Sequence, residues 1–259
     1  MSNKSIKILA IGNSFSVDGM EYLWNILTDA GYTDIILGNL AIGGCTVDTH
    51  ADNIKNNSPA YLYGKNTDGV WNWCEGKYIL DGLSDEEWDI VTLQQASGFS
   101  GQGETYRRKD EIIEYVKANI KNPNAKFYWH MTWAYDKNSP HIHFDFYSKD
   151  QDIMYNSIVS SVKAEILADK SFAGVIPTGT AIQNLRGYIG DNVTRDSFHL
   201  SESHGRFTAA LTWAKTLCKV DIDSVNWLPP TYAEIILPDL SEIKKSVNDA
   251  LKVPFSVTD

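Results

Sequence analysis

The stretch Ile8-Leu9-Ala10-Ile11-Gly12-Asn13-Ser14-Phe15-Ser16 decides how the rest of this chain is interpreted. An apolar run ends at a glycine, a short polar turn presents a serine, and amphipathic spacing follows almost at once. This pattern is typical of a buried strand that leads into a helix at the edge of a sheet, where open α/β folds bind their ligands. Ser14 would then present its hydroxyl at that edge. We therefore predict that Ser14 is a nucleophile.

Strand-like and helix-like segments alternate along the remaining sequence. The predicted strands are 6–11, 34–38, 89–93, 125–129 and 173–176, and the main predicted helices are 106–120, 149–168, 202–218 and 238–251. Such alternation predicts a single α/β domain over residues 1–259, a three-layer α/β/α flavodoxin-like fold with a five-stranded parallel sheet. Two aromatic-rich stretches, 48–83 and 130–147, lack clear periodicity and are expected to be loop insertions. We also expect a helix capped by Asp18, since Glu21 would complete a capping box.

Composition limits the possible partners. The formal net charge is −10 and the isoelectric point is near 5.0, which argues against nucleic acid and against an anionic membrane. No apolar run approaches the ~18 residues of a membrane span. Because Met1 lies directly before the first predicted strand without an apolar signal segment, we expect a cytoplasmic protein, unless the chain was trimmed from a secreted precursor.

A serine nucleophile needs a general base, and His199 is the candidate. Parallel strands end at the same edge of a sheet, so the loop that holds Asp196-Ser197-Phe198-His199 is expected to lie near Ser14. Asp196 would fix the tautomer of the imidazole and stabilise its charged form. Taken alone, this pattern is more typical of a loop Asp that caps the helix that starts near Ser201. Together with Ser14, the pattern favours a Ser-His-Asp triad.

An oxyanion hole requires N–H donors directed at the developing negative charge. The backbone N–H groups of Ser14 and Gly44 are the expected donors. Glycine at position 44 allows the main chain to approach a substrate closely, although Gly43-Gly44 is also typical of an ordinary tight turn.

Three of these segments resemble the SGNH/GDSL hydrolases. Gly12–Ser16 is similar to the first block of that superfamily, Asn39 with Gly44 to the second, and Asp196–Leu200 to the last. The resemblance implies a serine esterase that needs no cofactor. The third block differs: where the family has G-x-N-D, this chain has Gln94-Gln95-Ala96-Ser97. We expect the Gln95 carboxamide to be the third oxyanion donor, as in carbohydrate-esterase branches with glutamine there, and Ser97 is the alternative donor. A glutamine that only satisfies buried backbone groups is the alternative role for Gln95.

Aromatic residues after the fourth predicted strand suggest the substrate. The residues expected to contact it are Asn13, Trp129, His130, Trp133 and Tyr135. Flat rings with polar tips suit the faces of sugars, so we expect hydrolysis of small acyl esters, above all acetyl groups on a carbohydrate. For any single ring, packing of a loop onto the sheet is the alternative. The predicted partner is a small-molecule or glycan ester.

Two other function classes remain open at this point. His130, His141 and His143 could form the site of a metal-dependent hydrolase, although we predict that no metal is bound. The altered third block is also compatible with a glycan-binding SGNH homologue that has lost turnover. A serine esterase is the main prediction.

Overall fold

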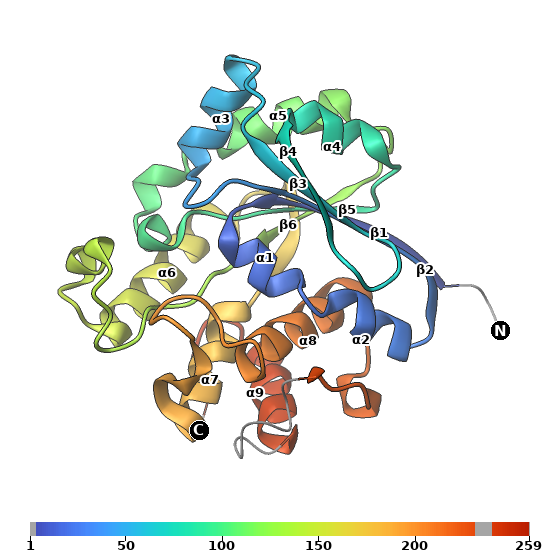
Figure 1. Cartoon of the computed structure of the whole chain (residues 1–259). Coiled ribbons are helices and arrows are strands. Elements are labelled where there is room, and N and C mark those ends of the chain that lie inside the picture. Colours follow the sequence, from blue (N-terminus) through green and yellow to red (C-terminus); the bar gives the residue numbers. More distant parts are fainter. Residues whose placement is uncertain (1–3, 231–239, 259) are drawn as a thin grey trace.

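The computed structural model of the chain describes residues 4–230 and 240–258, which form a mixed sheet covered by helices on both faces (Figure 1). The strands are β1 (Lys4–Gly12), β2 (Tyr32–Ala41), β3 (Tyr61–Asn66), β4 (Asn72–Lys77), β5 (Ile90–Leu93), β6 (Lys126–His130) and β7 (Phe172–Ile176). The helices are α1 (Ser14–Met20), α2 (Leu23–Asp29), α3 (Val47–Lys55), α4 (Ile79–Asp85), α5 (Lys109–Asn119), α6 (Gln151–Glu165), α7 (Thr178–Ile189), α8 (His204–Cys218) and α9 (Leu240–Lys252). Short 3-10 helices are η1 (Ser97–Phe99), η2 (Gly103–Tyr106), η3 (Ile142–Tyr147), η4 (Gly190–Val193) and η5 (Ile222–Ser224).

The seven strands lie in the order β4-β3-β2-β1-β5-β6-β7. The five strands predicted from the sequence are all present and run parallel to one another as β2-β1-β5-β6-β7. From the central strand β1 the chain moves to β2 on one side and later crosses to β5 on the other. The crevice beyond the ends of β1 and β5 is therefore a topological switch point, where α/β sheets bind their ligands.

The prediction of a five-stranded parallel sheet is wrong in strand number and direction, because the sheet has seven strands and β3 pairs antiparallel with β2 and with β4. The stretch 48–83, predicted as a loop insertion, contains α3, α4 and the antiparallel hairpin β3–β4, which extends the sheet beyond β2. Short strands interrupted by Gly64 and Gly76, with polar residues on exposed faces, carry little periodicity. Because β3 runs antiparallel to β2, the open end of the hairpin lies at the edge where the parallel strands end.

Helices α1, α2, α7, α8 and α9 pack together on one face of the sheet, while α3, α4 and α5 cover the other (Figure 1). The helix expected at Asp18 begins earlier, at Ser14, because the side chain of Asn13 accepts a hydrogen bond from the Phe15 N–H and caps α1. The start of the predicted helix 238–251 lies outside the described residues, and α9 covers the remainder.

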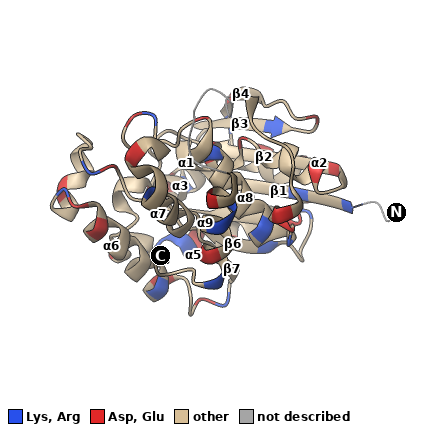
Figure 2. Cartoon of the chain, turned by 90° about the horizontal axis from the view of Figure 1, so that it is seen from below, with Lys and Arg blue, Asp and Glu red and all other residues tan. Residues whose placement is uncertain are grey.

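The interior of the sheet is strongly apolar. Residues Ile8 to Ile11 of β1 are at most 1% exposed, as are Trp88 and Trp129. Figure 2 shows Lys and Arg residues interspersed with Asp and Glu on the visible face. In residues 4–230 and 240–258, no helix combines the length and the apolar character needed to span a bilayer.

Candidate active site

Ser14 lies at the first position of α1, immediately beyond the end of β1. Its side chain is half-buried at the switch point. The capped turn at Asn13 changes the chain direction over two residues, so the serine is held at the edge of the sheet rather than inside it. This is the position that the opening sequence pattern predicts.

The structure brings Ser14, His199 and Asp196 into one hydrogen-bonded row. His199 Nε2 lies 2.8 Å from Ser14 Oγ, and His199 Nδ1 lies 2.7 Å from Asp196 Oδ2. The first distance falls within the ~2.6–3.2 Å needed for a base that removes a hydroxyl proton. An ionised Asp196 accepts a hydrogen bond from the Nδ1–H group, so a neutral imidazole presents its unprotonated Nε2 to the serine. The row is therefore chemically arranged to activate the hydroxyl.

Asp196 is held by a tight turn as well as by the imidazole. Its Oδ1 accepts the backbone N–H groups of Phe198 and His199. Burial by itself would raise the pKa of the Asp196 carboxyl, but the hydrogen bonds from His199 outweigh burial and hold that pKa below its ordinary value. Ser197, between them, has a φ of 75°, a left-handed conformation that a non-glycine residue rarely adopts. The turn thus keeps the carboxylate charged and aimed at the ring.

A buried carboxylate on α1 connects the serine helix to the histidine loop. Asp18 accepts hydrogen bonds from the Leu200 N–H at 2.8 Å, from Arg195 at 3.0 Å and from Arg206 at 2.8 Å. The Arg195 N–H in turn donates to the carbonyl of His199. Asp18 is therefore not the helix cap that the sequence suggests. It anchors the loop on which the imidazole is carried.

Trp133 provides a second connection between the two segments. Its ring stacks on Phe15 with centroids 4.1 Å apart and planes at 3°, and its indole N–H donates to the Phe198 carbonyl at 2.7 Å. The side chain is fully buried. The prediction that Trp133 contacts substrate is therefore wrong, because no surface of the ring is left to do so. It positions the neighbours of Ser14 and His199 instead.

A chain of buried polar side chains supports the serine turn from below. The carboxamide of Gln94 donates to Asn13 Oδ1 at 2.8 Å, its oxygen lies 2.9 Å from His130 Nδ1, and His130 Nε2 lies 3.1 Å from the Thr178 hydroxyl. Both Asn13 and His130 are at most 2% exposed, so the prediction that they contact substrate is wrong. Burial lowers the pKa of His130 to about 3. This neutral imidazole has a structural role.

The expected role of Gln95 is also corrected. Its Nε2 donates to the carbonyl and the hydroxyl of Thr105, both at 2.9 Å. Its Oε1 accepts the backbone N–H groups of Val47 and Ala96. With its amide donors engaged inside the protein, Gln95 fastens η2 and α3 to the end of β5 rather than facing a substrate oxygen. The sequence could not distinguish it from Gln94, whose side chain does reach the serine turn.

The backbone donors predicted for the oxyanion hole remain available. Ser14 N–H belongs to the first turn of a helix, where N–H groups lack intrahelical acceptors. Gly44 is exposed and has a φ of 65°, which explains why glycine stands there. In the described ranges neither N–H donates a hydrogen bond within the chain. The hydroxyl of Ser97, the alternative third donor, pairs with the Tyr135 hydroxyl at 2.8 Å.

The remaining aromatic residues expected to contact substrate lie in the core. Trp129 packs between Tyr106 and Phe172, and both it and Tyr135 are at most 1% exposed. The rings of this region that do reach the surface are different ones, of which Phe198 contacts His199. They are Phe198, His143, Phe146 and Phe99. Of these rings, His143 and Phe146 lie in the predicted aromatic stretch 130–147, whereas Phe99 and Phe198 lie outside it.

Of the histidines considered for a metal site, His141 and His143 are neighbours with ring centroids 5.3 Å apart, but His130 is not among their partners. His130 is enclosed beside Gln94, whereas His141 accepts the N–H of His143 and packs on Phe198. Across residues 4–230 and 240–258, no group of three or more His, Cys, Asp or Glu side chains is arranged to hold a metal ion. The arrangement of ligands therefore does not support a metal-dependent hydrolase.

An open pocket of about 460 Å³ lies directly beside Ser14. The serine lines it together with α1, the loop after β2 and the open end of the β3–β4 hairpin. Its volume is typical of ligand pockets, which span roughly 300–1,000 Å³. A small ester could therefore enter between the serine and the hairpin.

This α/β fold, with its hydrogen-bonded Ser-His-Asp row, is similar to the folds of solved SGNH hydrolases and esterases. A putative SGNH hydrolase from Slackia heliotrinireducens matches 83% of this chain over 100% of its own, with a TM-score of 0.58 and 20% identity. An acetylxylan esterase from Geobacillus stearothermophilus matches 87% of this chain over 98% of its own, with a TM-score of 0.51 and 10% identity. At these identities the likeness concerns the fold.

The chain belongs to the DUF4886 family, described as a domain of unknown function, whose family profile matches residues 7–235. The crystal structure of a DUF4886 family protein from Bacteroides uniformis is 37% identical, with a TM-score of 0.89 and 98% of each chain covered. No curated protein matches the chain.

Proposed function

We propose that this protein is a serine esterase that hydrolyses small acyl esters through an acyl-enzyme on Ser14. The observation that carries the proposal is the row Ser14–His199–Asp196, with hydrogen bonds of 2.8 and 2.7 Å, beside an open pocket at the switch point. A hydrogen-bonded serine and histidine enclosed without access to solvent would not support catalysis. Here the hydroxyl, the base and the pocket meet at one place.

In the proposed reaction, Ser14 Oγ attacks the ester carbon while His199 Nε2 accepts its proton. The resulting oxyanion would accept hydrogen bonds from the N–H groups of Ser14 and Gly44, each worth roughly 3–4 kcal/mol in such sites. When the carbon–alcohol bond breaks, His199 returns the proton to the departing alcohol oxygen. Water, deprotonated by the same imidazole, then releases the acid from Ser14.

For the alcohol part we propose a carbohydrate, with acetyl as the simplest acyl group. Phe198, half-buried and centred 4.2 Å from the imidazole, offers a flat apolar face of the kind that contacts sugar rings. The likeness to an acetylxylan esterase, although confined to the fold, is consistent with this choice. The support originally expected from Trp129, Trp133 and Tyr135 no longer applies, because these rings are buried.

Replacing Ser14 with alanine tests the proposal. With p-nitrophenyl acetate, Ser14→Ala is expected to lower kcat by at least about 10³-fold, since removal of a triad nucleophile leaves only residual catalysis. Ser84→Ala, on the exposed face of α4, is the matched control and should retain full activity. Both variants should unfold at the wild-type temperature, and a chelator should leave the wild-type rate unchanged. Wild-type turnover by Ser14→Ala would rule out the mechanism.

A further inference from the structure

The pocket beside Ser14 is built by a part of the chain outside the parallel sheet. Its walls include Val17 on α1, Ala41 at the end of β2 with Ile42 after it, and Leu62 and Glu75 from the hairpin. Most of these side chains are apolar, and Glu75 is the carboxylate among them. The hairpin therefore shapes the space next to the serine without contributing to the Ser-His-Asp row.

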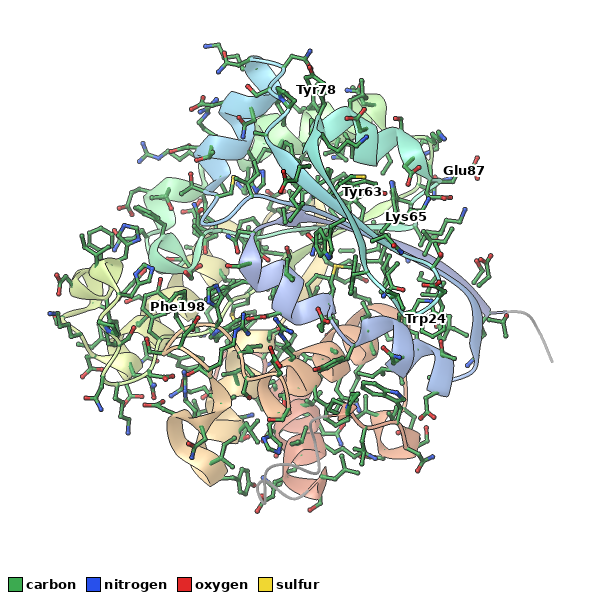
Figure 3. The ribbon with its side chains drawn as sticks, in the orientation of Figure 1. Trp24, Tyr63, Lys65, Tyr78, Glu87 and Phe198 are labelled. Atoms are coloured by element: carbon green, nitrogen blue, oxygen red, sulfur yellow. The ribbon has the colours of Figure 1, made fainter. Side chains whose placement is uncertain are left out.

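The position of the pocket relative to the imidazole indicates which half of an ester it would hold. Ser14 lines the pocket, whereas His199 and Asp196 do not. In Figure 3, Phe198 of the histidine loop lies on one side of α1, and Tyr63 and Lys65 of the hairpin lie on the other.

During acylation, the bond from Ser14 Oγ to the acyl carbon forms as the proton moves to His199. The bond to the alcohol oxygen then breaks, and that oxygen takes the same proton from His199. The alcohol must therefore lie next to the imidazole. The acyl chain, attached to the same carbon, extends away from it and toward the hairpin.

We infer that the hairpin pocket binds the acyl chain, and that it favours neutral chains longer than acetyl, such as butyryl and hexanoyl. This inference rests on the proposed function. A water molecule takes up about 30 Å³ of liquid, and an acetyl methyl group is of similar size, so acetyl would fill a small part of the 460 Å³. Each additional methylene in contact with the apolar wall should improve kcat/KM by about two- to fourfold.

Val17 offers a direct test because it lies three residues after Ser14, on the same side of α1. The measurement is kcat/KM for p-nitrophenyl acetate, butyrate, hexanoate and octanoate. The wild type should prefer butyrate over acetate by about 4- to 16-fold, because butyrate adds two methylenes. Val17→Phe should fill the pocket and move the preference toward acetate, whereas Val17→Ala should move it toward longer chains. Leu167→Phe, on an exposed site away from the pocket, should keep the wild-type profile.

Glu75 provides an independent test of the same assignment. An aryl adipate monoester has the length of a hexanoate ester but ends in a carboxylate, which Glu75 would repel. Glu75→Gln should raise the adipate-to-hexanoate ratio of kcat/KM by roughly fivefold, the size expected for an exposed charge pair. Glu87→Gln, an exposed carboxylate at the end of α4 (Figure 3), should leave that ratio unchanged.

The outcomes separate this inference from the proposed esterase. Hydrolysis that requires Ser14 but shows one chain-length profile for wild type, Val17→Phe and Val17→Ala overturns the acyl pocket while the esterase stands. A wild-type preference for acetate over butyrate overturns it as well. Hydrolysis that survives Ser14→Ala overturns the proposed function itself. Opposite shifts by the two Val17 variants support the pocket, because general damage to the helix would not produce them.

Discussion

Replacing Asp18 with asparagine tests whether one buried carboxylate holds the two halves of the candidate site together. The Asp18 side chain is 1% exposed and accepts three hydrogen bonds at 2.8–3.0 Å. Asparagine keeps an oxygen for the Leu200 N–H but removes the charge that pairs with Arg195 and Arg206. Breaking a buried ion pair costs ~3–5 kcal/mol. Both arginines keep some contact with solvent, so we expect a loss of about 3 kcal/mol in the free energy of unfolding.

The same change is expected to slow catalysis, because Leu200 directly follows His199 in the anchored loop. A displacement of ~1 Å can lower a rate by ~10²-fold. We therefore expect kcat to fall by about 10- to 100-fold, with KM nearly unchanged, as for a group that acts in the transition state.

Urea unfolding measures the stability, and hydrolysis of p-nitrophenyl acetate measures kcat, with active protein counted by fluorophosphonate labelling of Ser14. Asp52→Asn is the matched control: Asp52 lies 2.7 Å from Arg108, but it is 58% exposed, so the loss should stay below ~1 kcal/mol. On a His199→Ala background, Asp18→Asn should no longer affect the residual rate, because it acts through that histidine. Wild-type stability, or an undiminished effect on that background, would refute the reasoning.

Three further predictions concern the support of the site. Burial lowers the pKa of His50 to about 4 and that of His130 to about 3, whereas histidines in the unfolded chain have pKa values near 6.5. The unfolded chain therefore binds more protons, so the stability should be complete above pH 6.5 and fall as the pH drops toward 4, by ~2 kcal/mol per histidine at pH 5. Equal urea midpoints at pH 8 and pH 5 would contradict this prediction. Gln95→Ala should lower the free energy of unfolding by ~2–3 kcal/mol, because the backbone N–H groups that donate to Gln95 and the Thr105 acceptors lose their partner. A large loss of kcat at unchanged stability would instead support Gln95 as an oxyanion donor. Ser197→Gly should preserve activity, whereas Ser197→Val should destabilise the protein by ~1–2 kcal/mol in thermal unfolding, because a β-branched residue disfavours a φ of 75°. Wild-type stability of the valine variant would argue against a constrained turn.

The parallel part of the fold could be predicted from the sequence because its central strands are buried on both faces. Buried runs such as Ile8–Ile11 and Ile90–Leu93, the latter apolar except for Thr92, have few alternatives. The hairpin could not be predicted, since β3 and β4 lie at the margin of the sheet, where exposed polar residues and glycines obscure the alternation. Topology then placed the serine and the histidine loop at one edge, as the order of the strands implies.

Within the site, the pairing of His199 with Ser14 and Asp196 was predictable, whereas the partners of the buried side chains around it were not. Ser14, Gly44 and the Asp196–His199 loop each follow from a turn next to a strand or a helix. The choice of Gln95 over Gln94 failed because successive residues at a strand end point to opposite sides, and the sequence does not show which side faces the serine. The prediction that aromatic residues after β6 contact substrate was wrong for a related reason. The polar groups of Trp133 and Tyr135 form hydrogen bonds inside the protein.

In this chain the β3–β4 hairpin is structurally separate from the Ser-His-Asp row. It joins the sheet through the edge of β2 and provides none of the three residues of that row. Under the proposed function, changes within residues 60–77 would therefore alter substrate preference and leave the reacting side chains unchanged. Selection could act on this segment independently of the helix and the loop that carry the chemistry.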